Sequence, residues 1–196
     1  YDHMVNDHPG YNPENLAYVY IGAVDSTGRA KLIEETQRLP EVDAITTCYN
    51  LPFWGASGNN VYLPGDDREL FNIADLYDVG NDYLNVLEIP IVEGQYFTEN
   101  TTSSQEILVS RNFIEYMKPF ADWSDGAVGK TVQITGHDTK SESMPLFTIR
   151  GVFEDFRLGS IAGEEPRSCS IRKGRPNIWS FGTIAFLPRP YARRRI

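Results

Sequence analysis

Carboxylates are the most frequent side chains in this sequence that could perform chemistry. Among them are Asp66, Asp67, Glu69, Asp75, Asp78, Glu154 and Asp155. A glycosidase needs two carboxyl groups that face each other across a cleft, one of them with a raised pKa. The sequence does not show such a convergence, and the stretch GDDRE at 65–69 has the composition of a solvated hairpin turn. A hydrolase that uses acidic side chains therefore stands as a third hypothesis, behind two others developed below.

The stretch GAVGKT, residues 126–131, resembles the end of a phosphate-binding P-loop. The full motif requires a glycine five residues before Gly129, where this chain has Ser124. A P-loop also continues into a helix whose amides and dipole point at the phosphate, whereas VQIT after Lys130 alternates like a strand. We therefore expect a turn that leads into a strand, with Gly129 supplying a permissive backbone.

Histidine, serine and cysteine residues form no recognisable catalytic or metal-binding pattern. His3 and His8 have no neighbouring run of ligands, and no serine lies in a Gly-x-Ser-x-Gly motif. We therefore expect no metal ion and no other cofactor. Cys48 and Cys169 fit no zinc spacing. We expect two small buried side chains, and a long-range disulfide stays open as the alternative in an oxidising compartment.

An aromatic loop is the best candidate in the sequence for an interaction site. The segment NLPFWGASGNN, residues 50–60, combines an aromatic pair with several turn residues. Tryptophan and tyrosine beside asparagine on loops suit a platform for a sugar or a peptide. The candidate residues are Phe53, Trp54, Asn59, Asn60 and Tyr62. The more ordinary interpretation is that Phe53 and Trp54 fill a seam between subdomains.

Composition and charge narrow the classes of function. The 196 residues carry 18 Lys and Arg against 27 Asp and Glu, so nucleic acid is not an expected partner. Arginines 193–195 are expected to form a solvated tail. At 41% apolar residues the chain can build a core, but no window reaches the ~18 apolar residues of a membrane span. The start at Tyr1, without a signal peptide, indicates an excised piece or a processed product.

The first 50 residues predict a strand, a helix and a second strand after a polar N-terminal arm. Residues 16–22 predict a strand that is buried on both faces. Residues 26–39 predict a helix that Ser26 caps and Pro40 ends. Leu32, Ile33 and Leu39 share its apolar face, and the burial of each is expected to contribute ~1.5–3 kcal/mol. Residues 42–49 complete a βαβ-like or split βαβ unit.

The rest of the chain predicts mostly strands. The expected elements are a hairpin of 61–65 and 69–79, a short helix at 81–87, a strand at 106–110, a helix at 111–118 capped by Ser110, an antiparallel pair of 130–136 and 146–156, and a last strand within 177–187. Residues 157–176 are polar and contain Gly and Pro, so we expect little regular structure there.

One series of segments resembles the extracytoplasmic domain of MacB/FtsX-type ABC transporter permeases. The segments are DYLNVLEIPIVEGQYF, EILVSRNFIEYM, VGKTVQITG and FTIRGVFEDF. The matching positions are Tyr83, Leu84, Leu87, Ile89, Gly94, Phe97, Gly129, Val132, Ile149, Gly151, Val152, Asp155 and Phe156. Glu88 and Gln95 depart from the usual Gly and Arg of the family. The composition of stretches such as NPENLAYVYI is similar to that of family members from gut-type Bacteroidetes.

The resemblance implies an α+β fold of two lobes, a strand–helix–strand (porter-like) lobe and a mainly β (sabre-like) insert. Residues 1–50 would form the N-terminal arm and the first strand–helix–strand unit of the membrane-proximal lobe. Residues 51–157 would form the insert, and residues 158–196 would be a return segment. Compared with the family pattern, about 40 residues of a second unit are missing at this end, so we expect an incomplete lobe with an exposed sheet edge.

The resemblance also implies a function without catalysis. The domain would lie on the periplasmic side of the bacterial inner membrane, as part of a permease. Its partners would be the membrane-spanning part of the same permease, a cytoplasmic ATPase, a second permease copy and a periplasmic protein. It would transmit ATP-driven conformational change for export or substrate hand-over. The alternative is a free extracytoplasmic module that binds a sugar or a peptide through the Phe53/Trp54 loop.

Overall fold

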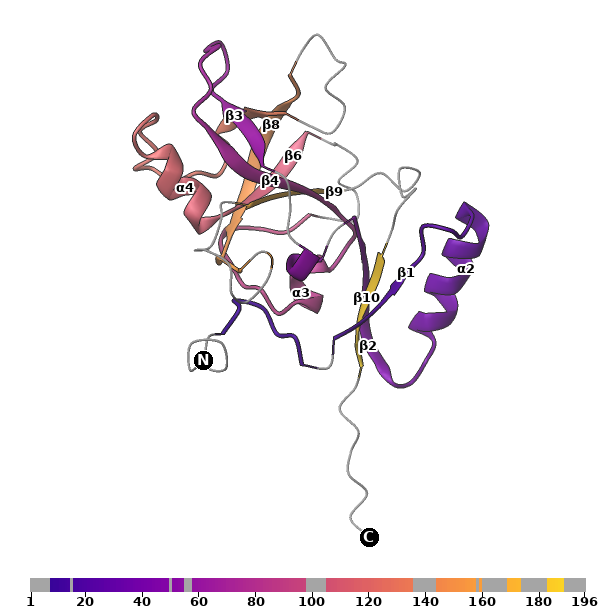
Figure 1. Cartoon of the computed structure of the whole chain (residues 1–196). Helices are drawn as coiled ribbons and strands as arrows, with labels where there is room; N and C mark the ends of the chain where they lie inside the picture. Colours follow the sequence, from indigo (N-terminus) through magenta and orange to yellow (C-terminus); the bar gives the residue numbers. More distant parts are fainter. Residues whose placement is uncertain are drawn as a thin grey trace.

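One continuous β-sheet connects the described parts of the chain in the computed structural model (Figure 1). The structure describes residues 8–14, 16–49, 51–54, 58–97, 105–135, 144–157, 159, 169–173 and 183–188. The sheet has ten strands, and the order along its main path is β1-β10-β2-β4-β3-β7-β8-β6-β9. Helices and strands together confirm the predicted α+β class.

The N-terminal unit is a split βαβ unit, one of the two arrangements that the sequence left open. It consists of β1 (Ala17–Tyr20), α2 (Ser26–Gln37) and β2 (Val42–Cys48). The late strand β10 (Thr183–Pro188) lies between β1 and β2 and is antiparallel to both. The chain therefore returns to its own beginning, and α2 covers one side of this small sheet (Figure 1).

Two details of this unit differ from the prediction. β1 is an edge strand, and Tyr18, Val19 and Tyr20 are 42–54% exposed, so the expectation of burial on both faces is wrong. The N-cap of α2 is Asp25, whose Oδ1 accepts a hydrogen bond of 2.7 Å from the Gly28 amide, and not Ser26. Asp25 has the extended backbone that an N-cap requires, and Ser26 already lies within the helix.

The apolar face of α2 is mostly exposed to solvent. No residue of α2 is buried, and Leu32 and the following Leu39 are 36% and 50% exposed. Only Ile33 reaches the small cluster of Ile21 and Ile45 on the sheet. The expected 1.5–3 kcal/mol per residue was therefore too high for the two leucines, because a stripe contributes only where another element covers it.

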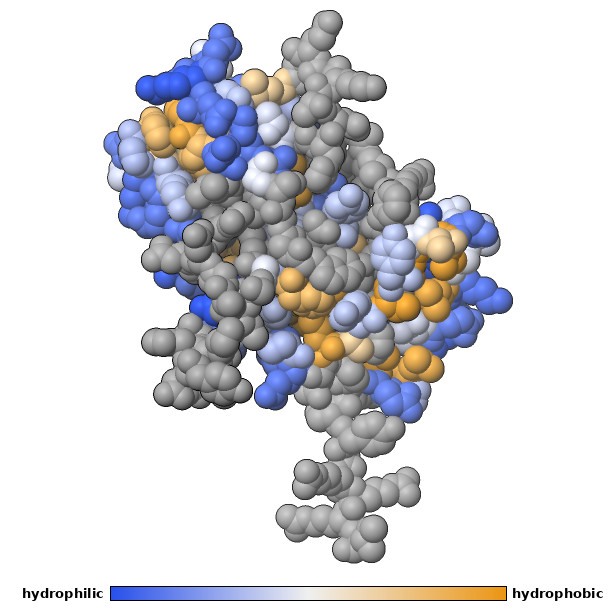
Figure 2. All heavy atoms as spheres, in the orientation of Figure 1, coloured by the Kyte–Doolittle hydropathy of each residue, from blue (hydrophilic) through white to orange (hydrophobic). Residues whose placement is uncertain are grey.

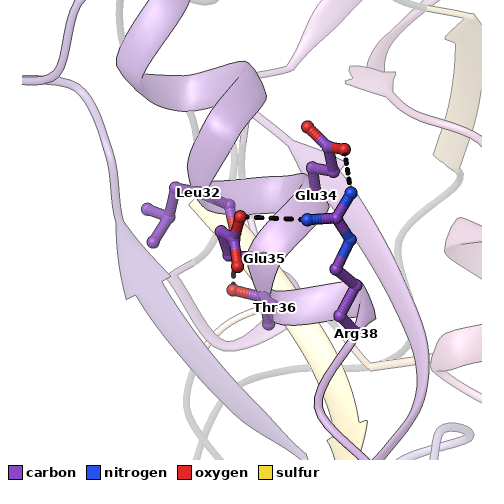
Figure 3. Close-up of polar contacts among 5 residues, drawn as sticks. All are labelled: Leu32, Glu34, Glu35, Thr36 and Arg38. Carbon is purple, nitrogen blue, oxygen red and sulfur yellow. Dashed lines mark hydrogen bonds and ion pairs between the residues drawn. The ribbon is translucent and has the colours of Figure 1, made fainter.

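The polar face of α2 carries the ion pairs expected from its charge pattern. Arg38 Nη2 lies 2.5 Å from Glu34 Oε1, and Arg38 Nη1 lies 3.1 Å from Glu35 Oε1. Figure 3 shows Arg38 between the two carboxylates, with Leu32 on the opposite side of the helix. All three charged side chains are more than half exposed, so these pairs contribute little to stability.

Six strands beyond β2 close into a ring. They are β4 (Phe71–Val79), β3 (Asn59–Tyr62), β7 (Thr131–Ile134), β8 (Leu146–Phe153), β6 (Glu106–Ser110) and β9 (Cys169–Lys173). Each pairs with the next in this order, and β9 pairs back to β4. The predicted β3–β4 hairpin and the antiparallel β7–β8 pair are confirmed.

Two strands of this region do not follow from the sequence pattern. β9 lies in the segment 157–176, where we expected little regular structure, and β5 (Ile91–Gly94) pairs with β8. β9 is held by its neighbours, because it is parallel to β4 and antiparallel to β6. Its polar sequence gives no strong strand signal, so tertiary pairing decides its structure.

Two helices flank the ring strands. α3 (Tyr83–Val86) is a single turn with Tyr83, Leu84 and Val86 buried, and α4 (Arg111–Met117) buries Phe113 and Met117. Ser110 is the N-cap of α4, as predicted, and its Oγ accepts a hydrogen bond of 3.3 Å from the Phe113 amide. A 3₁₀ turn, η1 (Pro52–Trp54), follows β2.

Two large apolar clusters lie on opposite sides of shared strands. Leu108 of β6 belongs to the cluster that includes α3, whereas its neighbours Ile107 and Val109 belong to the cluster that includes α4. Adjacent residues of a strand point to opposite faces, so β6 is buried on both faces. β4 is shared in the same way, through Tyr77 on one side and Leu76 on the other.

The strand register separates the two cysteines. Cys48 pairs with Val79 on one edge of β4, whereas Cys169 pairs with Asp75 across the other edge. Two strand spacings and four residues along β4 place the two Cα atoms more than about 10 Å apart. A disulfide needs a Cα separation below about 7 Å, so the alternative of a Cys48–Cys169 bridge is excluded.

Candidate functional site

Asn59, one of the five predicted interaction residues, is buried and its side chain bridges three strands. Its Nδ2 donates to the Thr135 carbonyl just after β7, and its Oδ1 accepts a hydrogen bond of 3.1 Å from the Leu76 amide of β4. Only 8% of the residue is exposed. Asn59 therefore satisfies backbone groups of β4 and β7 where the short strand β3 begins.

Asn60 and Tyr62 lie together on β3, with Glu69 beside them. Asn60 Nδ2 donates to Glu69 Oε2 at 2.8 Å and lies 3.5 Å from the Tyr62 hydroxyl. Both residues are partly exposed. An amide, a phenol and a carboxylate next to each other offer hydrogen-bonding groups of the kind that polar ligands use.

Phe53 lies apart from this polar group. It packs against the cluster that contains α3, and its ring centroid is 5.3 Å from that of Tyr18 on β1. The backbone of Trp54 completes η1, and its side chain lies outside the described residues. The loop as an interaction site stays a prediction.

The loop that resembles a P-loop holds a carboxylate of the protein itself. Oε1 of Glu93 accepts hydrogen bonds from the amides of Ala127, at 3.1 Å, and Val128, at 3.2 Å. Gly126 has φ of +103°, and a Cβ at this position would lie 2.7 Å from the same oxygen. Strand β7 follows the loop, so no helix dipole points at it. No motif pointed to Glu93, which lies 33 residues before Gly126.

The acidic stretches serve as turn and cap residues. In the β3–β4 turn, Asp66 Oδ1 accepts a hydrogen bond of 2.9 Å from the Arg68 amide. After β8, Glu154 forms an ion pair of 3.1 Å with Arg111. Asp155 Oδ1 accepts a hydrogen bond of 2.7 Å from the Asn112 amide, and burial raises the pKa of this carboxyl. In the part of the chain that the structure describes, no three His, Cys, Asp or Glu residues come together to hold a metal ion.

Three other groups owe their raised pKa values to packing. Burial raises the pKa of the Cys48 thiol to about 12 and also raises the pKa of the Tyr11 phenol. Burial likewise raises the pKa of Tyr96, whose hydroxyl accepts a hydrogen bond of 3.2 Å from the Tyr83 amide and donates to the Gly80 carbonyl at 3.1 Å. These shifts mark the groups as parts of the core.

Apolar side chains of β1 and α2 are exposed, on both faces of β1, and we call them together the β1/α2 surface. It consists of Tyr18, Val19, Tyr20, Leu32 and Leu39, all more than a third exposed. Figure 2 shows orange hydrophobic residues over α2 and the strands beside it. Exposed apolar patches mark interaction sites more often than single exposed residues do. The sequence pointed to burial here, because apolar strands and stripes are normally covered.

A second surface feature is an open groove of about 520 Å³ beside α4. Ile114, Phe120 and Trp123 supply apolar lining, and Lys118 and Asp122 supply charge. No motif predicted an interaction site in this segment, although aromatic residues and a proline stand together in its Pro-Phe-Ala-Asp-Trp stretch. Among the residues that the structure describes, none of the helices has the length and apolar character needed to cross a bilayer.

Comparisons with solved structures give the same fold. The chain is similar to the periplasmic region of MacB from Actinobacillus actinomycetemcomitans, with a TM-score of 0.58 and 16% identity over 97% of this chain and 82% of that one. It is also similar to a domain of a protein described as a permease from Porphyromonas gingivalis, with a TM-score of 0.56 and 17% identity over 94% and 79% of the two chains. The extracellular domain of the noncanonic ABC-type transporter YknZ from Gram-positive bacteria gives 0.54 and 13%, over 90% and 83%.

The sequence matches one protein-family model over most of its length. No curated protein sequence matches the chain significantly. Residues 3–171 match the model of the MacB-like periplasmic core domain, and this range includes the segments that carried the resemblance. Domains of this family form the extracytoplasmic part of inner-membrane ABC transporter permeases. The chain therefore belongs to the family of MacB-like periplasmic core domains.

Proposed function

We propose that this domain transmits the ATP-driven conformational change of an ABC permease as a rigid body, for export or for substrate hand-over, and that it has no catalytic activity. The observation that carries the proposal is the position of β4. This nine-residue strand pairs with β2 at Val79 and with β3 and β9 of the ring. Strand β4 thus links the N-terminal unit to the ring by backbone hydrogen bonds. No flexible linker separates the two regions at this point.

The two-lobe division forms part of this proposal. Residues 1–50 with the return segment 158–196 would be the membrane-proximal lobe, and residues 51–157 would be the insert. The pairing of β10 with both β1 and β2 supports the first lobe. The return segment also supplies β9, which pairs with β4 and β6 of the insert. The two lobes would thus be joined through β4 and through the return segment.

Two features support a role in assembly. Burial explains the raised pKa values of the Asp155 carboxyl, the Cys48 thiol and the Tyr96 phenol, so these shifts need no catalytic role. The exposed β1/α2 surface fits a domain that works in contact with other proteins. Membership of this family of permease domains implies a membrane-spanning part and an ATPase partner. We further propose a permease dimer and a periplasmic partner.

Spin-label distances in the complete permease would test this function. Labels replace the exposed residues Lys31 on α2 and Glu115 on α4, in a Cys169→Ser background. We expect the Lys31–Glu115 distance within one domain to stay the same with and without ATP. The distance between Lys31 labels of two copies should change with ATP, and a hydrolysis-deficient ATPase should hold one state. A constant distance between copies, or a changed distance within the domain, would contradict the proposal.

The adjacent side chains of Asn60, Tyr62 and Glu69 favour a second candidate function, the binding of a sugar or a peptide. Asn60 Nδ2 lies within 3.5 Å of both the Tyr62 hydroxyl and Glu69 Oε2, on a partly exposed surface. Titration of tryptophan fluorescence with sugar and peptide panels tests this function. Saturable quenching that is lost in both Trp54→Ala and Tyr62→Ala would support binding, and unchanged fluorescence across the panels would dismiss it.

A further inference from the structure

The N-terminal segment 8–14 does not run freely into β1. It crosses two other parts of the fold first. The Arg157 amide, just after β8, donates a hydrogen bond of 2.7 Å to the Pro9 carbonyl. The Asn12 amide donates a hydrogen bond of 3.0 Å to the Leu87 carbonyl at the end of α3. Backbone groups therefore tie the segment to two elements that are far from it in sequence.

Side chains reinforce the same two attachments. Tyr11 is only 8% exposed and belongs to the apolar cluster that contains α3, and its ring meets Phe156 edge-on with centroids 6.4 Å apart. Asn12 Nδ2 donates a hydrogen bond of 2.9 Å to Glu88 Oε2. Gly10, with φ of +82°, lies so close to the backbone that a Cβ there would be 2.7 Å from Phe156 Cα and would also collide with the Asp155 carbonyl.

The backbone of Glu88 gives an independent observation. Glu88 has φ of +57°, a left-handed conformation that favours glycine. A non-glycine residue persists there only when its surroundings hold it. Its side chain accepts the hydrogen bond from Asn12, so a glycine at this position would remove a contact to the N-terminal segment.

The elements that receive the segment are themselves connected. The Ile89 amide bonds to the Leu84 carbonyl at 2.8 Å, and the Glu154 amide bonds to the Pro90 carbonyl at 2.9 Å. α3 is therefore joined through residues 89–90 to the end of β8. Residues 8–14 lie across this joined body.

We propose that residues 8–14 form a bracket that fixes the N-terminal segment to α3 and to the end of β8. When residues 8–14 are displaced, α3 and the end of β8 then move with them, before the displacement reaches β1. This inference rests on the proposed transmission role for its functional meaning, but the bracket itself is a property of the isolated chain.

Hydrogen exchange on the 196-residue chain tests the bracket with Gly10→Ala. The reporters are the amides of Asn12, Ile89, Glu154 and Arg157, and the comparison amides are Leu70 and Thr135, which bond within the β3 region. Gly65→Ala is the matched control, because Gly65 has φ of +81° and nothing within 4 Å of an added Cβ. Gly65→Ala therefore introduces the backbone strain of a positive φ without a steric collision of the added Cβ.

We expect Gly10→Ala to raise exchange at all four reporter amides by a similar factor, about tenfold or more, while Leu70 and Thr135 stay within about twofold of the parent chain. Gly65→Ala should leave the four reporters unchanged. Asn12→Ala removes the side-chain contact to Glu88 and the hydrogen bond from the Glu14 amide within the segment, and it keeps the backbone bond to Leu87. It should give the same pattern with a smaller factor.

Two outcomes would overturn the proposal. If only Asn12 and Arg157 exchange faster, the segment frays alone and carries nothing into α3. If all six amides accelerate equally in Gly10→Ala and none responds selectively in Asn12→Ala, the segment contributes only to global stability. A confirmed bracket in a permease whose domains do not move with ATP would reject the transmission role and leave the bracket standing.

Discussion

Glu93 and Ala127 are joined by a hydrogen bond of 3.1 Å, from the Ala127 amide to Oε1 of the Glu93 carboxylate. The same oxygen accepts a hydrogen bond of 3.2 Å from the next amide, that of Val128. A side chain of β5 thus holds the loop that leads into β7. The carboxylate occupies the amides that a bound anion would need, which explains why a P-loop-like stretch has a structural role here.

Removal of this carboxylate should loosen the loop. We expect Glu93→Ala to lower the free energy of unfolding by about 1–2 kcal/mol, because two amides lose their acceptor and the Ala127 amide is partly buried. Urea denaturation measures the change. The control is Glu115→Ala, whose exposed ion pair with Lys118 should matter by less than about 0.5 kcal/mol. Equal effects of the two substitutions would contradict this role of Glu93.

Arg150 should resist replacement by lysine. Its Nη1 lies 3.1 Å from Glu106 Oε1, and its Nε donates a hydrogen bond of 3.0 Å to the Tyr96 carbonyl. A lysine ammonium cannot reach both acceptors with the same geometry. We expect Arg150→Lys to lower the free energy of unfolding by about 1–2 kcal/mol.

A matched substitution on the surface tests whether geometry is the cause. Arg38→Lys replaces an arginine that also contacts two acceptors, Glu34 and Glu35, but is 63% exposed. We expect its effect to be near zero. If Arg150→Lys proves equally silent in thermal and urea denaturation, the partly buried network around Tyr96 is not a stabilising contact.

Replacement of Asp82 by glycine should stabilise the protein. It has φ of +63°, and as the N-cap of α3 its side chain makes no capping hydrogen bond. We expect Asp82→Gly to raise the free energy of unfolding by about 0.5–1 kcal/mol, since relief of the left-handed strain exceeds the added entropy of the unfolded chain.

Glu88→Gly is the informative comparison for Asp82→Gly. Glu88 has a similar φ of +57° but accepts a hydrogen bond from Asn12. Its replacement should therefore stabilise the protein less than Asp82→Gly does. A larger gain at Glu88, measured by urea denaturation, would mean that the Asn12 contact contributes nothing.

The Asp155 carboxyl should lower the stability of the protein as the pH rises. Burial raises its pKa above the ordinary value of 3.8, so the folded state holds this proton at pH values where the unfolded state has lost it. Stability from this group is therefore greatest at low pH and decreases as pH rises from 3.8 through the raised pKa. Relative to Asp155→Asn, which cannot ionise, the parent chain should gain stability on acidification through this window.

Asp122 supplies a control of opposite sign for this pH experiment. Hydrogen bonds from Ser124 lower the pKa of Asp122, so its contribution is present above 3.8 and is lost as pH falls through the lowered value. Relative to Asp122→Asn, the parent chain should lose stability on acidification. Urea denaturation at a series of pH values gives both differences, and equal slopes for the two variants would refute the assignment.

Cys48 should not react with thiol reagents in the folded protein. Burial raises the pKa of this thiol to about 12, and the residue has no exposed surface. In a Cys169→Ser background, we expect labelling by a disulfide reagent at neutral pH to be at least about 100-fold slower than for a free thiol and to accelerate in urea. Fast labelling without denaturant would show that the β2–β4 junction opens readily.

Local patterns predicted those elements whose structure depends on near neighbours. Ser110 is the cap of α4 because an extended serine before a helix satisfies a free amide wherever the helix packs. The β7–β8 pair and the β3–β4 hairpin follow from alternating residues joined by polar connections. The cap of α2 was wrong by one position, because Asp25 and Ser26 are both good caps and only the backbone conformation separates them.

Distant contacts decided the rest of the candidate sites. Asn59 was predicted as part of a binding platform, and its position between β4 and β7 depends on strands that meet only in the folded chain. Glu93 had no motif of its own, and its role appears only where β5 approaches the loop before β7. The groove beside α4 likewise depends on how the Phe120–Trp123 segment folds back on that helix.

The sequence alone determined the α+β class, the strand–helix–strand order of the N-terminal unit and the family, because alternation, helix periodicity and ordered motifs are local properties that the residues carry with them. Tertiary structure alone decided that β9 joins the ring, that Cys48 and Cys169 lie on opposite sides of β4, and that β1 and α2 leave apolar side chains exposed. The physical reason is that burial and strand pairing depend on partners from distant parts of the chain, whose positions no local pattern records.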